Sequence, residues 1–154
     1  LGMAELSGKL LGLQDVKVFE VTDYENNIGI GRVGTFEHDM TVGECCELVK
    51  QVFQIPNVKM FGSIEQHVKR VAISPGSGKK MTAVAVKHGA DVLITGDIDH
   101  HEGIDAVAQG VTIIDAGHYG LEHIFIQDMV MYMNENMPEL IVEHAKIRHP
   151  FQVI

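Results

Sequence analysis

Few cysteines, few basic side chains and the absence of long apolar runs exclude several classes of protein before any motif is considered. The only cysteines are Cys45 and Cys46. Because neighbours in sequence rarely form an unstrained disulfide, we expect two reduced thiols on a helix. Twelve basic residues stand against 21 acidic ones, and the net charge is −9. Since lysine and arginine dominate phosphate binding, this balance argues against a nucleic-acid groove.

Apolar runs such as VLIT at 92–95 and IFI at 124–126 are short, whereas a membrane-spanning helix needs about 20 apolar residues. The first residues have neither the basic end nor the apolar centre of a signal peptide. We therefore expect a cytoplasmic protein without a membrane segment. The chain begins at Leu1 rather than methionine, which indicates that residues were removed or that the chain is part of a longer polypeptide.

Strand-like and helix-like segments alternate along the chain and predict a single α/β domain over residues 1–154. The expected strands cover 15–21, 28–36, 57–63, 68–74, 90–96, 111–117 and 140–146, and the expected helices cover 3–12, 42–54, 79–89, 101–110 and 119–133. Thr41 and Glu44 fit a capping box before the second helix. Short, continuously apolar strands such as 90–96 are typical of burial on both faces, so we expect a largely parallel or mixed sheet flanked by helices.

Nine histidines are many for a chain of this length. His118 directly follows the strand at 111–117 and lies four residues before Glu122, so the two side chains share one helix face. In open α/β sheets, ligands bind beyond the carboxyl ends of the strands. A neutral imidazole and a carboxylate at this spacing can bind one divalent ion if further ligands come from elsewhere. The alternative is an exposed His–Glu pair without a ligand.

Asp97 and His101 follow the strand at 90–96. Because parallel strands end at the same edge of a sheet, both side chains could approach His118 and border a metal site. The alternative is that Asp97 or Asp99 caps the helix that begins near His101.

The segment PGSGKK at 75–80 is a glycine-rich turn before a helix. It fails the pattern of a phosphate loop, but backbone N–H groups at such a turn can bind an anion. The alternative is a simple link between strand and helix. The methionines near the C-terminus are more typical of a core or oligomer contact than of a cofactor site; they are Met129, Met131, Met133 and Met137.

Several segments, taken together, resemble one protein family. They are GIGRVG (29–34), MTVGECCELVK (40–50), KRVAISPGSGKK (69–80), GADVLITGDIDHHEGIDA (89–106) and VTIIDAGHYGLE (111–122). Their order and spacing are similar to the C-terminal half of the NIF-three-like proteins, which are catalogued as GTP cyclohydrolase 1 type 2 homologs. The resemblance covers nearly the whole chain, and DAGHYGLE and ITGDIDHH are its most specific parts.

The resemblance implies an α/β fold of two similar halves around a cleft, of which this chain is one half. It also implies a homo-oligomer, a ring-shaped hexamer in the family, and two divalent metal ions per subunit, whether zinc, iron or manganese. By the motif match, His118 and Glu122 are the metal ligands of this half. Asp97 and His101 border the site as substrate-facing, catalytic residues, and a nucleotide or another small anion is the expected ligand.

The family's other metal ligands lie in its N-terminal half, in a paired-histidine segment and at a later aspartate, and this chain matches neither. Three hypotheses follow. The first is a metal-dependent hydrolase in the intact parent protein, where a metal-activated water attacks a nucleotide or related substrate. The second is a metal-binding or regulatory module without catalysis, and the third is an inactive fragment that lacks the N-terminal ligands.

Overall fold

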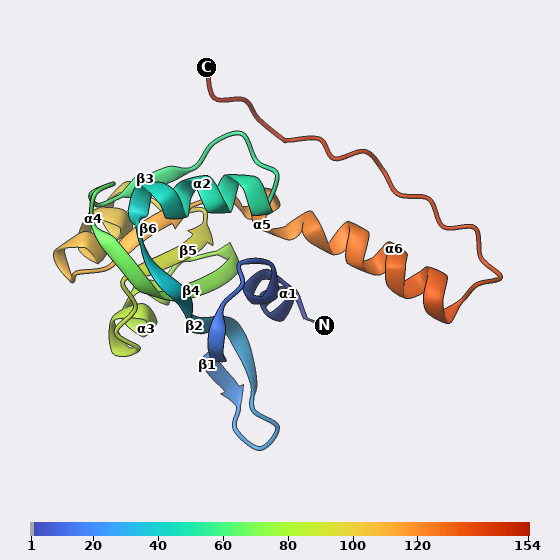
Figure 1. The fold of residues 1–154 in the computed structure, drawn as a ribbon, viewed down its shortest axis with the longest axis horizontal. Helices are drawn as coiled ribbons and strands as arrows, with labels where there is room; N and C mark the ends of the chain where they lie inside the picture. The colour runs from blue at the N-terminus through green and yellow to red at the C-terminus, as the bar shows by residue number, and fades with distance from the viewer. Residues whose placement is uncertain (1) are drawn as a thin grey trace.

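A six-stranded mixed sheet is the frame of the structure, a computed structural model that describes residues 2–154 (Figure 1). The strands are β1 (Gln14–Asp23), β2 (Ile28–Thr41), β3 (Lys59–Phe61), β4 (His67–Ser77), β5 (Val92–Gly96) and β6 (Thr112–Asp115), in the order β1-β2-β4-β5-β6-β3. β4, β5 and β6 run parallel, whereas β1 with β2, β2 with β4, and β3 with β6 pair antiparallel. The mixed sheet predicted from the sequence is confirmed.

Helices cover both faces of this sheet. They are α1 (Met3–Leu10), α2 (Val42–Val52), α3 (Met81–Lys87), α4 (His100–Ala108), α5 (His118–Glu122) and α6 (Ile124–Asn136). Neighbouring residues of one strand serve opposite faces, because side chains alternate along a strand. In β5, Ile94 joins the core with α2 and α5, and Leu93 joins the core with α3 and α4. This burial on both faces explains why β5 is apolar throughout.

The start of α2 is built as the sequence predicts. Thr41 Oγ1 accepts the N–H of Glu44 at 3.2 Å, and the Thr41 N–H donates to Glu44 Oε2 at 2.7 Å, which is a capping box. Cys45 and Cys46 are free, buried thiols on this helix, as expected. Burial raises the pKa of the Cys45 thiol to about 12, so this thiol stays protonated and unreactive.

The C-terminal part departs from the prediction. Instead of one helix at 119–133, the chain forms α5 and α6, which meet at His123, and α6 projects from the body with no buried residue (Figure 1). The strand predicted at 140–146 is wrong. This segment is irregular because its backbone pairs with no strand of the described chain, and Ile141 is 95% exposed. Of the described helices, none is long and apolar enough to cross a membrane.

Glycines allow an unusually close approach at the edge where the parallel strands end. A Cβ atom on Gly96, the last residue of β5, would lie 2.6 Å from the backbone nitrogen of His118 and 2.8 Å from the carbonyl oxygen of Gly76. These distances leave no room for carbon beside rigid backbone atoms. Glycine at position 96 therefore lets β4, β5 and the start of α5 meet, and this contact places His118 beside β5.

Replacing Gly96 by alanine tests this contact. Gly96→Ala is expected to lower the free energy of unfolding by about 2 kcal/mol or more, because the added carbon displaces backbone atoms. Gly43→Ala in α2 is the matched control, since its Cβ would meet Ile64 O at an ordinary 3.4 Å. There, better helix propensity should leave stability unchanged or raise it by up to about 1 kcal/mol. Urea denaturation measures both, and equal stabilities would contradict the close approach at Gly96.

Candidate functional site

His118, the first residue of α5, lies between two carboxylates at the carboxyl edge of the sheet. Its Nδ1 is 2.8 Å from Asp97 Oδ2, and its Nε2 is 3.3 Å from Glu122 Oε1. The three side chains are roughly half exposed, so the site is open to solvent. Asp97 comes from the turn after β5, and Glu122 lies one helical turn beyond His118. The structure thus brings together three of the four site residues predicted from the sequence.

Asp97 is available to His118 because a different residue caps α4. Asp99 Oδ1 accepts the N–H of Glu102 at 2.9 Å, and the two residues form a capping box. Asp97 itself has a left-handed backbone, with φ of 58°. Such a conformation is unfavourable for most residues and is often found where function requires it. Of the two alternatives for this segment, Asp99 is therefore the cap, and Asp97 is turned toward the site.

His101, the fourth predicted residue, lies inside α4 rather than beside His118. Its ring packs edge-on against that of His100, with ring centroids 5.4 Å apart. In residues 2–154 it makes no hydrogen bond or ion pair with Asp97, His118 or Glu122. A catalytic role for His101 stays a prediction.

A buried carboxylate ties the loops of the site together. Asp115, the last residue of β6, accepts the backbone N–H groups of Asp97, Ile98 and Gly117 at 3.0 to 3.2 Å. Its Oδ2 also lies 3.1 Å from Nζ of Lys59. Asp115 is only 8% exposed, and a buried charge is tolerated when it is paired and hydrogen-bonded. The loops after β5 and β6 are therefore held at one point.

The sequence analysis missed Asp115 and Lys59. An acidic residue at the end of the otherwise apolar run TIID at 112–115 was a usable signal, because a carboxylate in a buried strand needs donors around it. Lys59 gave no such signal, since a lysine at the start of a short strand is ordinary on a protein surface.

The glycine-rich turn at 75–80 shapes the space beside Glu122. β4 continues through Ser77, and the N–H of Gly78 donates to Gly96 O at 2.8 Å. Gly76 has φ of 82°, and a Cβ atom there would lie 3.1 Å from Glu122 Oε1. The N–H of Gly78 therefore serves the contact with β5, and the glycine at position 76 leaves room next to the Glu122 carboxylate.

The neighbours of His118 raise its pKa above the ordinary value of 6.5. The largest cause is the hydrogen bond with Asp97, and the negative charges of Glu122 and Asp97 act in the same direction, against partial desolvation. In the neutral ring, Nδ1–H donates to Asp97, which leaves the lone pair of Nε2 directed toward Glu122.

This donor set fits a divalent metal ion. The 3.3 Å between His118 Nε2 and Glu122 Oε1 matches the separation of about 3.3 Å for two ligands that lie about 2.0 to 2.1 Å from a tetrahedral ion. Asp97 on Nδ1 is the carboxylate partner that commonly orients a metal-binding histidine. Within residues 2–154, no group of three or more His, Cys, Asp or Glu side chains is arranged to hold a metal ion. Within these residues, His118 and Glu122 would supply two ligands, which is fewer than a complete ligand set.

A pocket of about 670 Å³ opens beside Asp97 and His118. Its walls come from residues 55–57, 116–120 and 148–153. The last of these belongs to the C-terminal segment, which the sequence analysis assigned no part in the site. The pocket places space for a small molecule next to the His118 imidazole.

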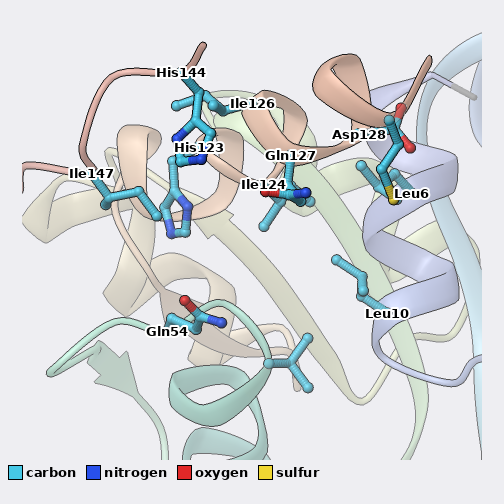
Figure 2. A pocket seen from close by; sticks show the side chains of 12 residues that line it. Leu6, Leu10, Gln54, His123, Ile124, Ile126, Gln127, Asp128, His144 and Ile147 are labelled. Carbon is cyan, nitrogen blue, oxygen red and sulfur yellow. The ribbon is translucent and has the colours of Figure 1, made fainter. Parts of the chain in front are cut away.

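A second pocket, of about 280 Å³, lies between α1, α6 and the C-terminal segment (Figure 2). Leu6, Leu10 and Ile147 make its lining largely apolar. His123 also lines it, but its Nε2–H donates to Phe53 O at 2.7 Å, which is a structural role. Its largely apolar lining distinguishes this pocket from the one at His118.

Sequence comparison identifies the family. A model of the family Duf34/NIF3 (NGG1p interacting factor 3) matches residues 1–150. A GTP cyclohydrolase 1 type 2 homolog of Staphylococcus aureus (strain MRSA252) is 41% identical over 131 residues, covering 82% of this chain and 36% of the relative. The homolog of Halalkalibacterium halodurans is 36% identical over 101 residues, covering 66% and 27%. The chain belongs to the DUF34/NIF3 family, so the resemblance found in the sequence is confirmed.

Solved structures agree with this assignment. The Staphylococcus aureus hypothetical protein SA1388 superposes with a TM-score of 0.82 at 26% identity, covering 99% of this chain and 64% of that chain. A Bacillus cereus protein related to NIF3 superposes with a TM-score of 0.83 at 18% identity, covering 99% and 70%, which shows the fold alone. The chain spans about a quarter to about a third of the length of the curated relatives above.

Replacing Asp115 tests whether it holds the loops. Asp115→Asn is expected to lower the free energy of unfolding by about 2 to 4 kcal/mol, because it removes a buried charge whose donors stay behind. Asp105→Asn on the exposed side of α4 is the matched control. Urea denaturation measures the loss, and amide NMR shifts of Asp97, Ile98 and Gly117 should move only in the Asp115 variant. Equal stability of the two variants would refute the role of Asp115.

The raised pKa of His118 gives a second test at this site. In an NMR titration of the metal-free chain, the His118 ring should titrate above 6.5, and Asp97→Asn should move its pKa down toward 6.5. The pKa of His118 is higher in the folded state than in the unfolded state. The Asp97–His118 pair therefore stabilises the fold fully below about pH 6.5, and this stabilisation is lost as the pH rises through the folded-state pKa of His118. The stability difference between wild type and Asp97→Asn should therefore shrink at high pH. An unchanged His118 pKa in Asp97→Asn would be the contrary result.

Proposed function

We propose that this chain supplies one side of a divalent-metal centre in a hydrolase that acts on a nucleotide. The observation that carries the proposal is His118, with Nδ1 held by Asp97 and Nε2 3.3 Å from Glu122 Oε1. The reaction class comes from the relatives, which are named GTP cyclohydrolase 1 type 2 homologs. GTP or a related nucleotide is therefore the proposed substrate.

A bound divalent ion would lower the pKa of a coordinated water and polarise the substrate. The residues of the chain prepare the place for it. Asp97 accepts the Nδ1 proton of His118, which keeps the Nε2 lone pair available and the ring fixed. Glu122 provides an anionic oxygen on the same helix face, and Asp115 keeps the two loops at the spacing that this geometry needs.

The remaining ligands are proposed to come from outside this chain. Within residues 2–154 no group of three or more His, Cys, Asp or Glu side chains is arranged to hold a metal ion, so this chain is proposed to supply only His118 and Glu122. The family resemblance implies that an N-terminal half completes a centre with two ions per subunit and that subunits assemble into a hexamer. Both statements are part of the proposal, and a cytoplasmic location stays a prediction.

A second candidate function is a metal-binding module without catalysis. The small number of proposed ligands in the described residues, His118 and Glu122, favours the non-catalytic module. A catalytic ion in a protein usually has three protein ligands and an open position for water. The third hypothesis, an inactive fragment, goes one step further: the chain alone would bind no metal ion.

Metal titration distinguishes the metal-dependent hydrolase, the non-catalytic module and the inactive fragment. Zn²⁺ binding measured by calorimetry should weaken about tenfold or more in His118→Ala and in Glu122→Gln, since each change removes one ligand. His38→Ala is the matched control, because His38 is exposed on β2 with only a 4.0 Å contact to Glu37. Equal affinity in wild type and all three variants would count against the centre. A metal-loaded parent protein that leaves GTP intact would favour the non-catalytic module.

A further inference from the structure

The C-terminal segment returns from the far end of α6 toward the body (Figure 1), where it contacts Tyr119 of α5. The N–H of Arg148 donates to the hydroxyl oxygen of Tyr119 at 3.4 Å. The His149 ring packs edge-on against the rings of Tyr119 and His123, with centroids 6.2 and 6.3 Å away. Ile147, one residue before Arg148, lines the apolar pocket between α1 and α6 (Figure 2). The contacts of Arg148 and His149 thus join the segment to the helix that carries His118 and Glu122.

This docking makes the segment a wall of the pocket at His118. Residues 148–153 line one side of the 670 Å³ space, and Asp97 and His118 lie among the residues that line it from the sheet edge. The ring of Phe151 reaches the backbone at the start of α5, with Cζ 4.0 Å from a Cβ built on Gly117. Phe151 therefore stands beside the residue that directly precedes His118.

Arg148 is the only lysine or arginine among the residues that line this pocket. In the part of the chain that the structure describes, it forms no ion pair with a carboxylate. Arg148 is exposed, so its guanidinium is accessible to a ligand in the pocket. Its planar fork of N–H donors matches the oxygens of a phosphate, so it is suited to an anionic ligand.

The same pocket offers aromatic surface. Tyr119, His149 and Phe151 line it, and Phe151 is 65% exposed. A large aromatic side chain that is held near a pocket and left uncovered can stack on a planar ring. The pocket therefore combines one cation with flat apolar surfaces, which is the chemistry that recognises a ring carrying a phosphate.

We propose that residues 148–153 form a nucleotide-binding wall, in which Arg148 binds the phosphate and Phe151 covers the base. This inference rests on the proposed function, because it names the substrate contacts of the same site. It assigns binding to a segment remote in sequence from the metal ligands. Metal content and nucleotide affinity should consequently respond to different substitutions.

The test is calorimetric binding of GTP and of guanosine to the 154-residue chain at a fixed, measured zinc content. Arg148→Ala should weaken GTP binding about tenfold or more, since a charge-assisted contact is lost, while guanosine binding and zinc content stay unchanged. Phe151→Ala should weaken both GTP and guanosine. Lys146→Ala is the matched control, because Lys146 is an exposed cation of the same segment outside the pocket, and its GTP affinity should equal that of wild type.

The outcomes separate this inference from the metal proposal. A chain that holds zinc through His118 but binds no GTP overturns the nucleotide wall and leaves the metal centre standing. Equal GTP affinities in Arg148→Ala and Lys146→Ala overturn it as well. GTP binding that depends on Arg148 in a chain that holds no zinc supports the wall and shows that the metal centre needs ligands from outside this chain. Circular dichroism checks folding, and all three substituted side chains are exposed.

Discussion

The carboxylate of Asp115 is the interaction on which the geometry of the site depends. Three backbone N–H groups and one ammonium group converge on it. A buried anion without these partners would cost several kcal/mol, so the loops after β5 and β6 must stay folded around it. The N–H that Asp97 gives to Asp115 helps to hold Asp97 in its left-handed conformation. From that position the Asp97 side chain reaches His118. The Asp97 carboxylate, in the loop after β5, thus orients the His118 imidazole, which follows β6.

Close backbone approach is the second constraint. Three parallel strands end at one edge of the sheet, where their backbones and the start of α5 lie close together and leave little space for side chains. Gly96 and Gly76 remove the side chains that would separate β4, β5 and α5. The result is an edge where a histidine and two carboxylates meet while half exposed. Full burial would favour neutral groups, whereas full exposure would leave the side chains unoriented, so the intermediate burial suits metal binding.

Sequence patterns correctly predicted the features that depend on interactions between residues close together in the chain. The capping box at Thr41 and the buried strand β5 follow from short-range bonding and from side-chain alternation, and both were found. The four-residue spacing of His118 and Glu122 likewise predicted that the two side chains lie on the same face of α5. The pairing of Asp97 with His118 spans 21 residues and depends on a left-handed turn, so spacing allowed it but did not require it. The strand expected at 140–146 failed because strand formation needs a partner, and no sequence pattern supplies one.

Electrostatics supports the two proposed cations of the pocket, a metal ion at His118 and the Arg148 guanidinium. The chain is acidic overall, and Asp97 and Glu122 lie at the sheet edge. A phosphate that approached this edge alone would meet like charge, which opposes binding. A divalent ion at His118 would neutralise the carboxylates, and Arg148 on the opposite wall would attract the phosphate away from them. In the proposed arrangement, the sheet edge would hold the reactive centre, and the C-terminal segment would select an anion that can reach it.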